Sequence, residues 1–227
     1  MKEQIEKLLG ESWYTLLQED WESDYFHELT KKLEQEYMRG AYNVFPGPKE
    51  VFNAYKACKP EDIKVVWLGQ DPYPNMGDAH GLSFSSLNKR IPASLRVIYK
   101  ELSTDLGVFK ESADLTPWTT EGVFLLNRIL TVIEGNPLSH RHLGWQELTA
   151  NTMKKLSETY PNLVFVFLGK TAQECGQFVK GDHLILNLPH PAAEAYSGGT
   201  AGFYGCKMFT KINEYLEANG KTKINWQ

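Results

Sequence analysis

The sequence has few cysteines, no long apolar run and no excess of positive charge. Its three cysteines, Cys58, Cys175 and Cys206, form no CxxC motif and no paired Cys/His spacing, which argues against a disulfide framework and a structural zinc site. The longest apolar runs, such as 163–168, are about six residues long, far short of the ~20 that span a bilayer. The first ten residues alternate charged and apolar side chains and show no export signal. We therefore expect a protein of the reducing cytoplasm that holds no metal.

The charge balance is slightly acidic. Lys and Arg number 24 and Asp and Glu number 28 in the 227 residues, for a formal net charge of -4. Domains that wrap nucleic acid are usually basic overall, so the balance argues against that class. Residues 1–62 hold 8 basic and 13 acidic residues, a net of -5, whereas residues 63–227 hold the other 16 and 15, a net of +1. The acidity therefore belongs to the N-terminal segment.

The composition is that of a globular protein, with 42% hydrophobic and 23% charged residues. The chain contains no internal repeat, no low-complexity tract and no linker long enough to separate domains. We expect one domain over residues 1–227, with an N-terminal helical cover at 1–62 and an α/β core at 63–227.

Four short apolar runs, rich in β-branched and aromatic residues, alternate with segments of helical periodicity. The apolar runs are 63–68, 123–126, 163–168 and 183–188. The helical segments are 94–106, 146–160, 171–179 and 205–218, and two apolar stripes at helical spacing within 5–40 predict two further helices. This alternation predicts an α/β fold with a central four-stranded parallel sheet flanked by helices on both faces.

Polar residues, held by Gly or Pro, follow each apolar run. They are GQDPYP at 69–74, Asn127, Gly169-Lys170 and Pro189-His190-Pro191. In open α/β sheets, ligands bind beyond the carboxyl ends of the strands. We therefore expect Asp71, Asn127 and His190 to converge on one site.

The chemistry of these three side chains suits work on a nucleobase. A single carboxylate such as Asp71, held by flanking prolines, can orient a water or stabilise a developing cation; the alternative is a turn cap. His190 lies in an apolar turn, so its ring stays neutral and can donate to an oxyanion, or it serves only as a structural hydrogen bonder. Asn127 carries the donors and acceptor that read the edge of a base, although a strand-terminal Asn is also a common turn former.

The chain resembles the family 1 uracil-DNA glycosylases in an ordered series of motifs between residues 63 and 226. These are GQDPYP (69–74), AHGLSFS (79–85), SLRVIYKEL (94–102), EGVFLLNRILTV (121–132), SHRHLGW (139–145), LPHP (188–191) and GFYGCKMFTKINEYL (202–216). The resemblance implies a uracil-DNA glycosylase-like fold that flips uracil out of DNA and hydrolyses its bond to deoxyribose. The product is an abasic site in base excision repair, and neither a metal nor an organic cofactor is needed.

The resemblance also assigns roles to individual residues. Asp71 would orient the attacking water and stabilise the sugar cation, and His190 would donate to uracil O2. Uracil would be bound by Gln70, Tyr73, Phe84 and Asn127, with Phe84 stacking on the base and Tyr73 excluding the thymine methyl group. DNA would be bound by Ser94, Gly169, Lys170 and Pro191. Without the resemblance, Phe84 would be a core residue and Ser94 a helix N-cap.

The implied partners are uracil-containing DNA, single- or double-stranded, and a small protein inhibitor that mimics DNA. We expect a monomer. The rival interpretations are a catalytically weak module that binds uracil or abasic DNA, and a glycosylase with shifted substrate preference. The intact Asp71, Asn127 and His190 argue against the first rival, and Tyr73 with Asn127 argues against the second.

The chain departs from the family pattern in three places. Pro74 stands where the family usually has His, 192–194 replaces a Ser-Pro-Leu, and the loop at 196–202 is longer and rich in glycine. The family's Leu is the wedge that fills the gap left by the flipped base. Glu194 is a poor wedge because its charge would face phosphates, and Tyr196 is the alternative. We expect retained chemistry and altered handling of duplex DNA, with a preference for single strands, where flipping costs less.

Overall fold

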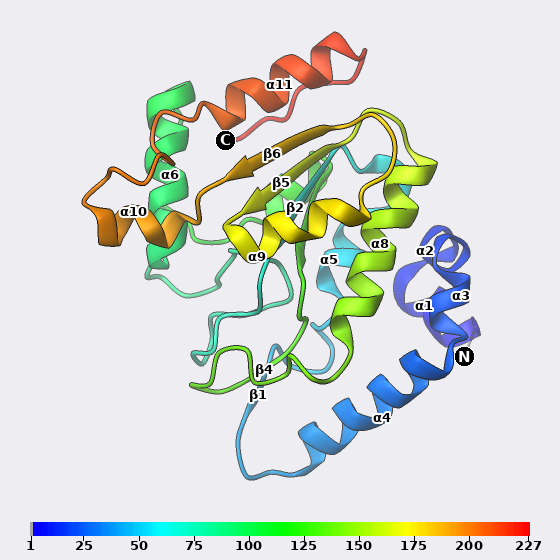
Figure 1. Cartoon of the computed structure of the whole chain (residues 1–227). Coiled ribbons are helices and arrows are strands. Elements are labelled where there is room, and N and C mark those ends of the chain that lie inside the picture. Colours follow the sequence, from blue (N-terminus) through cyan, green and yellow to red (C-terminus); the bar gives the residue numbers. More distant parts are fainter. Residues whose placement is uncertain (1) are drawn as a thin grey trace.

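A four-stranded parallel sheet forms the centre of the computed structural model, which describes residues 2–227 (Figure 1). Its strands, in the spatial order β3-β2-β5-β6, are β2 (Val65–Gly69), β3 (Val123–Asn127), β5 (Val164–Leu168) and β6 (Leu184–Leu188). Every residue of β2, β3 and β5 is buried, which explains their continuous apolar composition. The predicted parallel sheet is confirmed, and each strand lies within two residues of its expected bounds.

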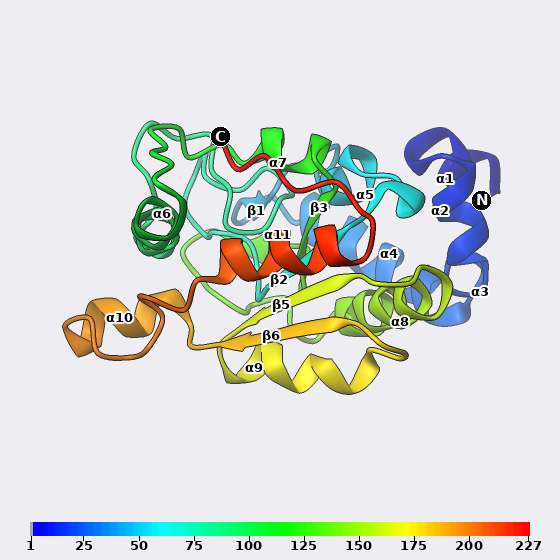
Figure 2. The same ribbon diagram turned by 90° about the horizontal axis from the view of Figure 1, so that it is seen from above.

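Helices cover both faces of the sheet, as predicted. Figure 1 shows α11 above the sheet and α8 and α9 below it, and Figure 2 shows the same layers from above. The helices that follow β2 are α6 (Ala93–Leu106), α7 (Thr116–Thr120), α8 (Trp145–Thr159), α9 (Lys170–Gln173), α10 (Pro191–Ser197) and α11 (Met208–Ala218), with a 3-10 turn η2 (Glu174–Phe178) after α9. No helix within residues 2–227 is both long enough and apolar enough to cross a membrane.

Aromatic side chains pack on each face of the central strands. Trp67 of β2 stacks on Trp118 at 5.7 Å between ring centroids and contacts Phe209 of α11. On the opposite face, Phe124 of β3 meets Tyr55 edge-on at 5.3 Å. Successive strand residues point to opposite faces, so one short apolar run supplies both layers. Each aromatic pair adds about 0.5–1.5 kcal/mol beyond the burial of its area, and this packing fixes the sheet on which the loops stand.

The N-terminal segment is helical, but its first predicted helix is divided. The helices are α1 (Lys2–Leu9), α2 (Glu11–Leu16), α3 (Gln18–Trp21), α4 (Asp24–Met38) and α5 (Asn53–Ala57), followed by a 3-10 turn η1 (Pro60–Asp62). Gly10 takes a φ of 89°, which interrupts the helix between α1 and α2. The second predicted helix is confirmed as α4, which begins where the Ser23 hydroxyl accepts the Phe26 N–H at 3.2 Å. In Figure 1, α1–α3 lie at the opposite end of the molecule from α10.

Two short elements matter for the site and have little signature in the sequence. β1 (Val44–Phe45) and β4 (Val132–Ile133) form an antiparallel pair that joins the segment after α4 to the segment after β3. Two residues are too few to show an alternating pattern, so this pair was not predicted. Helix α10 was also unexpected, because the sequence shows only a proline and small residues there.

Candidate active site

The carboxyl ends of the parallel strands open into a pocket of about 200 Å³. Its lining includes Gln70, Asp71, Tyr73, Phe84, Ser94, Asn127 and His190. All predicted catalytic and base-binding residues therefore meet in one cavity. Gly169 and Lys170 line an adjoining cavity of about 210 Å³, which shares Gln70 and His190 with the first. Pro191 is buried at the start of α10 and lines neither cavity.

Asp71 is half-buried, and its carboxylate is oriented by the main chain of a distant loop. Its Oδ2 accepts the Leu138 N–H at 2.7 Å. Burial raises the pKa of Asp71 above its ordinary value, and the Leu138 bond acts in the opposite direction. The result is an oriented, poorly hydrated carboxylate that can hold a water or face a cation. Sequence reasoning did not find Leu138, because a backbone donor has no side-chain signature.

The geometry around His190 determines which ring nitrogen carries the proton. Nδ1 accepts the Ala192 N–H at 3.1 Å, so the neutral ring holds its proton on Nε2. Burial lowers the pKa of His190, which favours this neutral form. The ring packs against Gly169, which has a φ of 86°, and a Cβ added there would lie 2.9 Å from the His190 Cβ. The site thus presents a neutral imidazole with one N–H to donate.

Asn127 ends β3 at the floor of the pocket and is only 6% exposed. Its Oδ1 lies against the backbone of Gly69, where an added Cβ would stand only 2.2 Å away. Glycine at position 69 is therefore what lets the amide side chain fit beside β2. A buried amide lining a cavity can give a ligand both a donor and an acceptor.

Two aromatic residues shape the wall of the pocket. Phe84 has a left-handed backbone with φ of 61° and is half-buried, with its ring 6.5 Å from the ring of His190. The Tyr73 hydroxyl donates to the Phe84 carbonyl at 3.3 Å, and burial raises the pKa of Tyr73, so the phenol stays neutral. Phe84 thus packs partly on the core and partly lines the cavity. A flat ligand stacked on the Phe84 ring would lie close to the His190 imidazole.

A basic groove of about 820 Å³ adjoins the pocket at Tyr73. It is lined by the exposed cations Lys89, Arg90 and Arg96, and none of them forms an ion pair within residues 2–227. The one acid in the groove, Asp78, is engaged by neighbouring hydroxyl and amide groups at 2.7 and 2.8 Å. The sequence analysis did not identify these cations as candidate DNA-binding residues, although Lys89 and Arg90 are adjacent and lie just before Pro92.

Ser94 lies in the first turn of α6, at the edge of the pocket. The interpretation of Ser94 as a helix N-cap is wrong, because Pro92 holds that position. A prolyl N-cap leaves the Ser94 hydroxyl without a capping role.

The loop after His190 separates Glu194 from Tyr196. Glu194 is 2% exposed, and its carboxylate accepts the N–H groups of Ala201 and Tyr204 at 3.2 Å each, and also that of Phe203. Tyr196 is 92% exposed. The buried Glu194 carboxylate therefore stabilises the glycine-rich loop. The Tyr196 side chain, by contrast, points into solvent.

Within residues 2–227, no group of three or more His, Cys, Asp or Glu side chains could hold a metal ion. The pocket itself presents one carboxylate, one neutral imidazole and one amide beside two aromatic side chains.

Comparisons with known proteins point to one family. The family model described as the uracil DNA glycosylase superfamily matches residues 55–217. A Bacteroides fragilis protein named uracil-DNA glycosylase 2 is 44% identical over 223 residues, which cover 96% of this chain and 98% of the relative. The crystal structure of mimivirus uracil-DNA glycosylase superimposes with a TM-score of 0.88 at 29% identity, covering 98% of this chain and 88% of that one. A single-residue variant of the mimivirus protein in complex with UGI has the same TM-score and identity, covering 98% and 90%.

Proposed function

The chain belongs to the uracil-DNA glycosylase superfamily, and from this premise we propose that its pocket hydrolyses the bond between uracil and deoxyribose in DNA. The observation that carries the proposal is the convergence of Asp71, Asn127 and His190 on one cavity of about 200 Å³. A base inside a duplex is out of reach of such a cavity, so the uridine must first leave the stack.

The pocket recognises the extruded base by its edge and its face. The Asn127 amide accepts from uracil N3–H and donates to O4, a pairing that cytosine would reverse. Phe84 stacks on the ring, and Tyr73 occupies the space that the methyl group of thymine would need. Because these groups are held by the sheet and its tight loops, little ordering is needed when the base enters.

Cleavage follows from the positions of the carboxylate and the imidazole. The C1′–N1 bond breaks, and its electron pair stays on uracil as negative charge on O2, to which His190 Nε2–H donates. Asp71 faces the positive charge on the sugar and orients a water, whose oxygen forms the new bond to C1′ and whose proton passes to the carboxylate. One preorganised donor to a developing oxyanion contributes about 2.7–4 kcal/mol to such a step.

Cations in two cavities that adjoin the pocket support DNA as the substrate. Lys170 lines the cavity that adjoins the pocket at Gln70 and His190, and the groove of Lys89, Arg90 and Arg96 adjoins the pocket at Tyr73. In the proposed complex these cations bind the phosphates next to the flipped nucleotide, and the Ser94 hydroxyl lines the pocket itself. The same face is a candidate surface for a protein inhibitor, as the mimivirus relative solved with UGI suggests.

The proposal is tested by base release from matched oligonucleotides that contain uracil, thymine or cytosine at one position, as single strands and as duplexes. We expect uracil to be released from both forms, faster from the single strand, and thymine and cytosine to stay attached. Binding without release would favour the weakly catalytic module. Release of another base but not of uracil would favour shifted specificity. No release of uracil from the single strand would overturn the proposal.

Tyr196 is the side chain that we expect to enter the base stack in place of the family's Leu. Base-to-aromatic stacking contributes about 1–3 kcal/mol, so Tyr196→Ala should lower kcat/KM on duplex DNA by about tenfold and on single strands far less. Phe109→Ala is the matched control, because Phe109 is also highly exposed, at 82%, and lines neither cavity. Equal losses on duplex and single-stranded substrates would remove Tyr196 from this role.

A further inference from the structure

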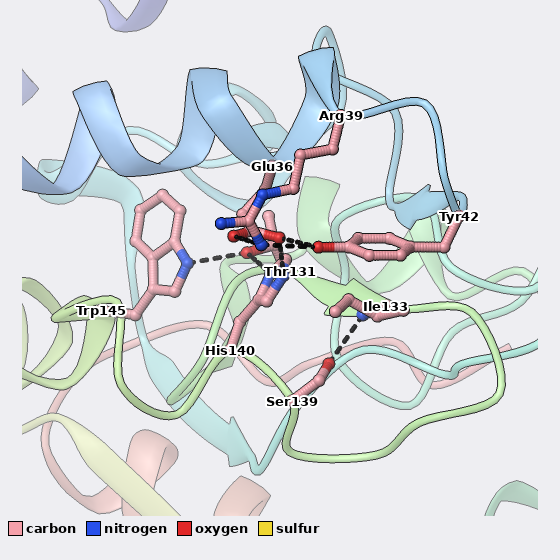
Figure 3. A network of polar contacts seen from close by, with 8 residues as sticks. All are labelled: Glu36, Arg39, Tyr42, Thr131, Ile133, Ser139, His140 and Trp145. Carbon is pink, nitrogen blue, oxygen red and sulfur yellow. Dashed lines mark hydrogen bonds and ion pairs between the residues drawn. The ribbon is translucent and has the colours of Figure 1, made fainter.

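A buried polar network joins α4 to the loop that carries His140 (Figure 3). His140 is 2% exposed, and its Nδ1 lies 2.8 Å from the Thr131 hydroxyl. Thr131 also accepts the indole N–H of Trp145 at 2.8 Å. On its other side, His140 Nε2 lies 3.8 Å from the carboxylate of Glu36, and it has no hydrogen-bond partner within residues 2–227.

The chemistry of these groups fixes the direction of the network. An indole N–H only donates, so the Thr131 oxygen accepts it, and the Thr131 hydroxyl proton is free to bond His140 Nδ1. The proton of the neutral imidazole then sits on Nε2 and points at Glu36. The other tautomer would set a nitrogen lone pair against a carboxylate.

Glu36 is itself held in place from the α4 side. The Tyr42 hydroxyl donates to it, and Arg39 forms an ion pair with it at 2.9 Å (Figure 3). The anchoring of α4 on the core does not depend on Glu36, because Phe26, Leu29 and Leu33 are buried earlier on the helix. An ion pair that is partly buried is weak evidence for a role in stability, because the cost of desolvating the charges offsets their attraction.

The same loop carries the donor that orients Asp71. Leu138, two residues before His140, gives its N–H to the carboxylate at 2.7 Å. Its backbone has a φ of 62°, which costs a non-glycine residue about 1–2 kcal/mol and persists only when the surroundings impose it. Those surroundings include the Arg141 N–H, which donates to the Leu138 carbonyl at 3.0 Å, the Ser139 hydroxyl, which accepts the Ile133 N–H at 2.8 Å, and the His140 ring (Figure 3).

We propose that Glu36 and His140 are positioning residues for the reaction, holding the loop so that the Leu138 amide orients the Asp71 carboxylate. The inference rests on the proposed function, in which Asp71 acts on water and sugar. It gives the N-terminal helical cover a part in catalysis, because Glu36 lies on α4 and β1, next to it, pairs with β4 at the base of the same loop.

The inference has a specific consequence for the pH dependence. Burial and the Leu138 bond are the influences that act on the pKa of Asp71, and no charged side chain is among them. Around His140, burial lowers its pKa and Glu36 raises it, with Arg39 beyond Glu36. If the loop loosens, Asp71 loses the bond that lowers its pKa, and the acid limb of the kcat profile must move to higher pH.

The test is Glu36→Ala, measured on a single-stranded uracil oligonucleotide, with Glu34→Ala as the control from the exposed face of α4. We expect kcat to fall by about tenfold with KM changed less than threefold, and the acid limb to move up by roughly half a pH unit or more. Glu36→Gln keeps a side-chain oxygen facing His140 Nε2–H and should recover most of kcat. The Glu34 variant should match the wild type in both measurements.

Two outcomes would overturn the inference. One is a Glu36→Ala enzyme with the kcat and acid limb of the Glu34 control; the other is a loss of activity with an unmoved acid limb, which indicates a purely structural role. If Glu36→Ala does not fold, as judged by circular dichroism, Glu36→Met, which keeps the length of the side chain and removes its oxygens, decides: an acid limb identical to that of Glu34→Met contradicts the inference, and an upward shift supports it. A wild-type enzyme that releases no uracil would instead contradict the proposed function.

Discussion

Asp71→Asn should lower the kcat for uracil release by about 10³- to 10⁴-fold, since the charge that holds the water and faces the sugar cation is lost. The substitution is close to isosteric. The Asn oxygen can still accept the Leu138 N–H that Asp71 accepts at 2.7 Å, so the loop should keep its place. The measurement is single-turnover release from a single-stranded uracil oligonucleotide.

The control for this variant is Asp182→Asn, an exposed carboxylate in the loop before β6, at the opposite end of the strand from His190. It should retain wild-type kcat. Binding of substrate by Asp71→Asn should remain within a few-fold of wild type, because Asn127, Phe84 and Tyr73 recognise the base. An Asp71→Asn enzyme within tenfold of wild-type kcat would refute the assigned role.

His190→Asn and His190→Ala should each lower kcat by about 10²- to 10³-fold, because both remove the Nε2–H that meets the charge on uracil O2. Comparing the two variants distinguishes a loss of the catalytic donor from a loss of the helix cap. The Asn oxygen can still accept the Ala192 N–H and cap α10, as His190 Nδ1 does at 3.1 Å, whereas Ala cannot. His190→Ala should therefore also be less stable by about 1 kcal/mol.

The measurements are kcat at several pH values and the thermal midpoint of each variant. Burial lowers the pKa of His190, so wild-type kcat should not fall through neutral pH on account of this residue. If only the Ala variant lost activity, His190 would be a cap of α10 and not the donor to the leaving base.

The sheet and the convergence of the site could be predicted from the sequence because both depend on local patterns. The run at 163–168 is apolar on both faces, which marks a buried parallel strand, and parallel strands must bring their carboxyl ends to one edge. Asp71, Asn127 and His190 each follow such a run directly. Their meeting in one pocket therefore needed no knowledge of long-range packing.

What the sequence could not reveal depends on tertiary contacts. The Leu138 amide reaches Asp71 across 67 positions of the chain and carries no side-chain signal. The charge of Glu194 suggested a surface residue, but its carboxylate turns inward because the glycine-rich loop offers it unpaired N–H groups. Likewise, the first apolar stripe, from Leu8 to Leu17, gave no sign that Gly10 would divide the first predicted helix.

The placement of α1–α3 at the far end of the molecule from α10 separates its charges in space (Figure 1). Residues 2–21 hold 5 acidic and 2 basic residues, a net of -3 out of the -5 of residues 1–62, while the cations of the groove lie beside the pocket. Such a molecule has an electric dipole, and the field of a nucleic acid exerts a torque on it before any contact forms. Encounters with DNA in which the pocket faces the phosphates are therefore favoured over the other orientations.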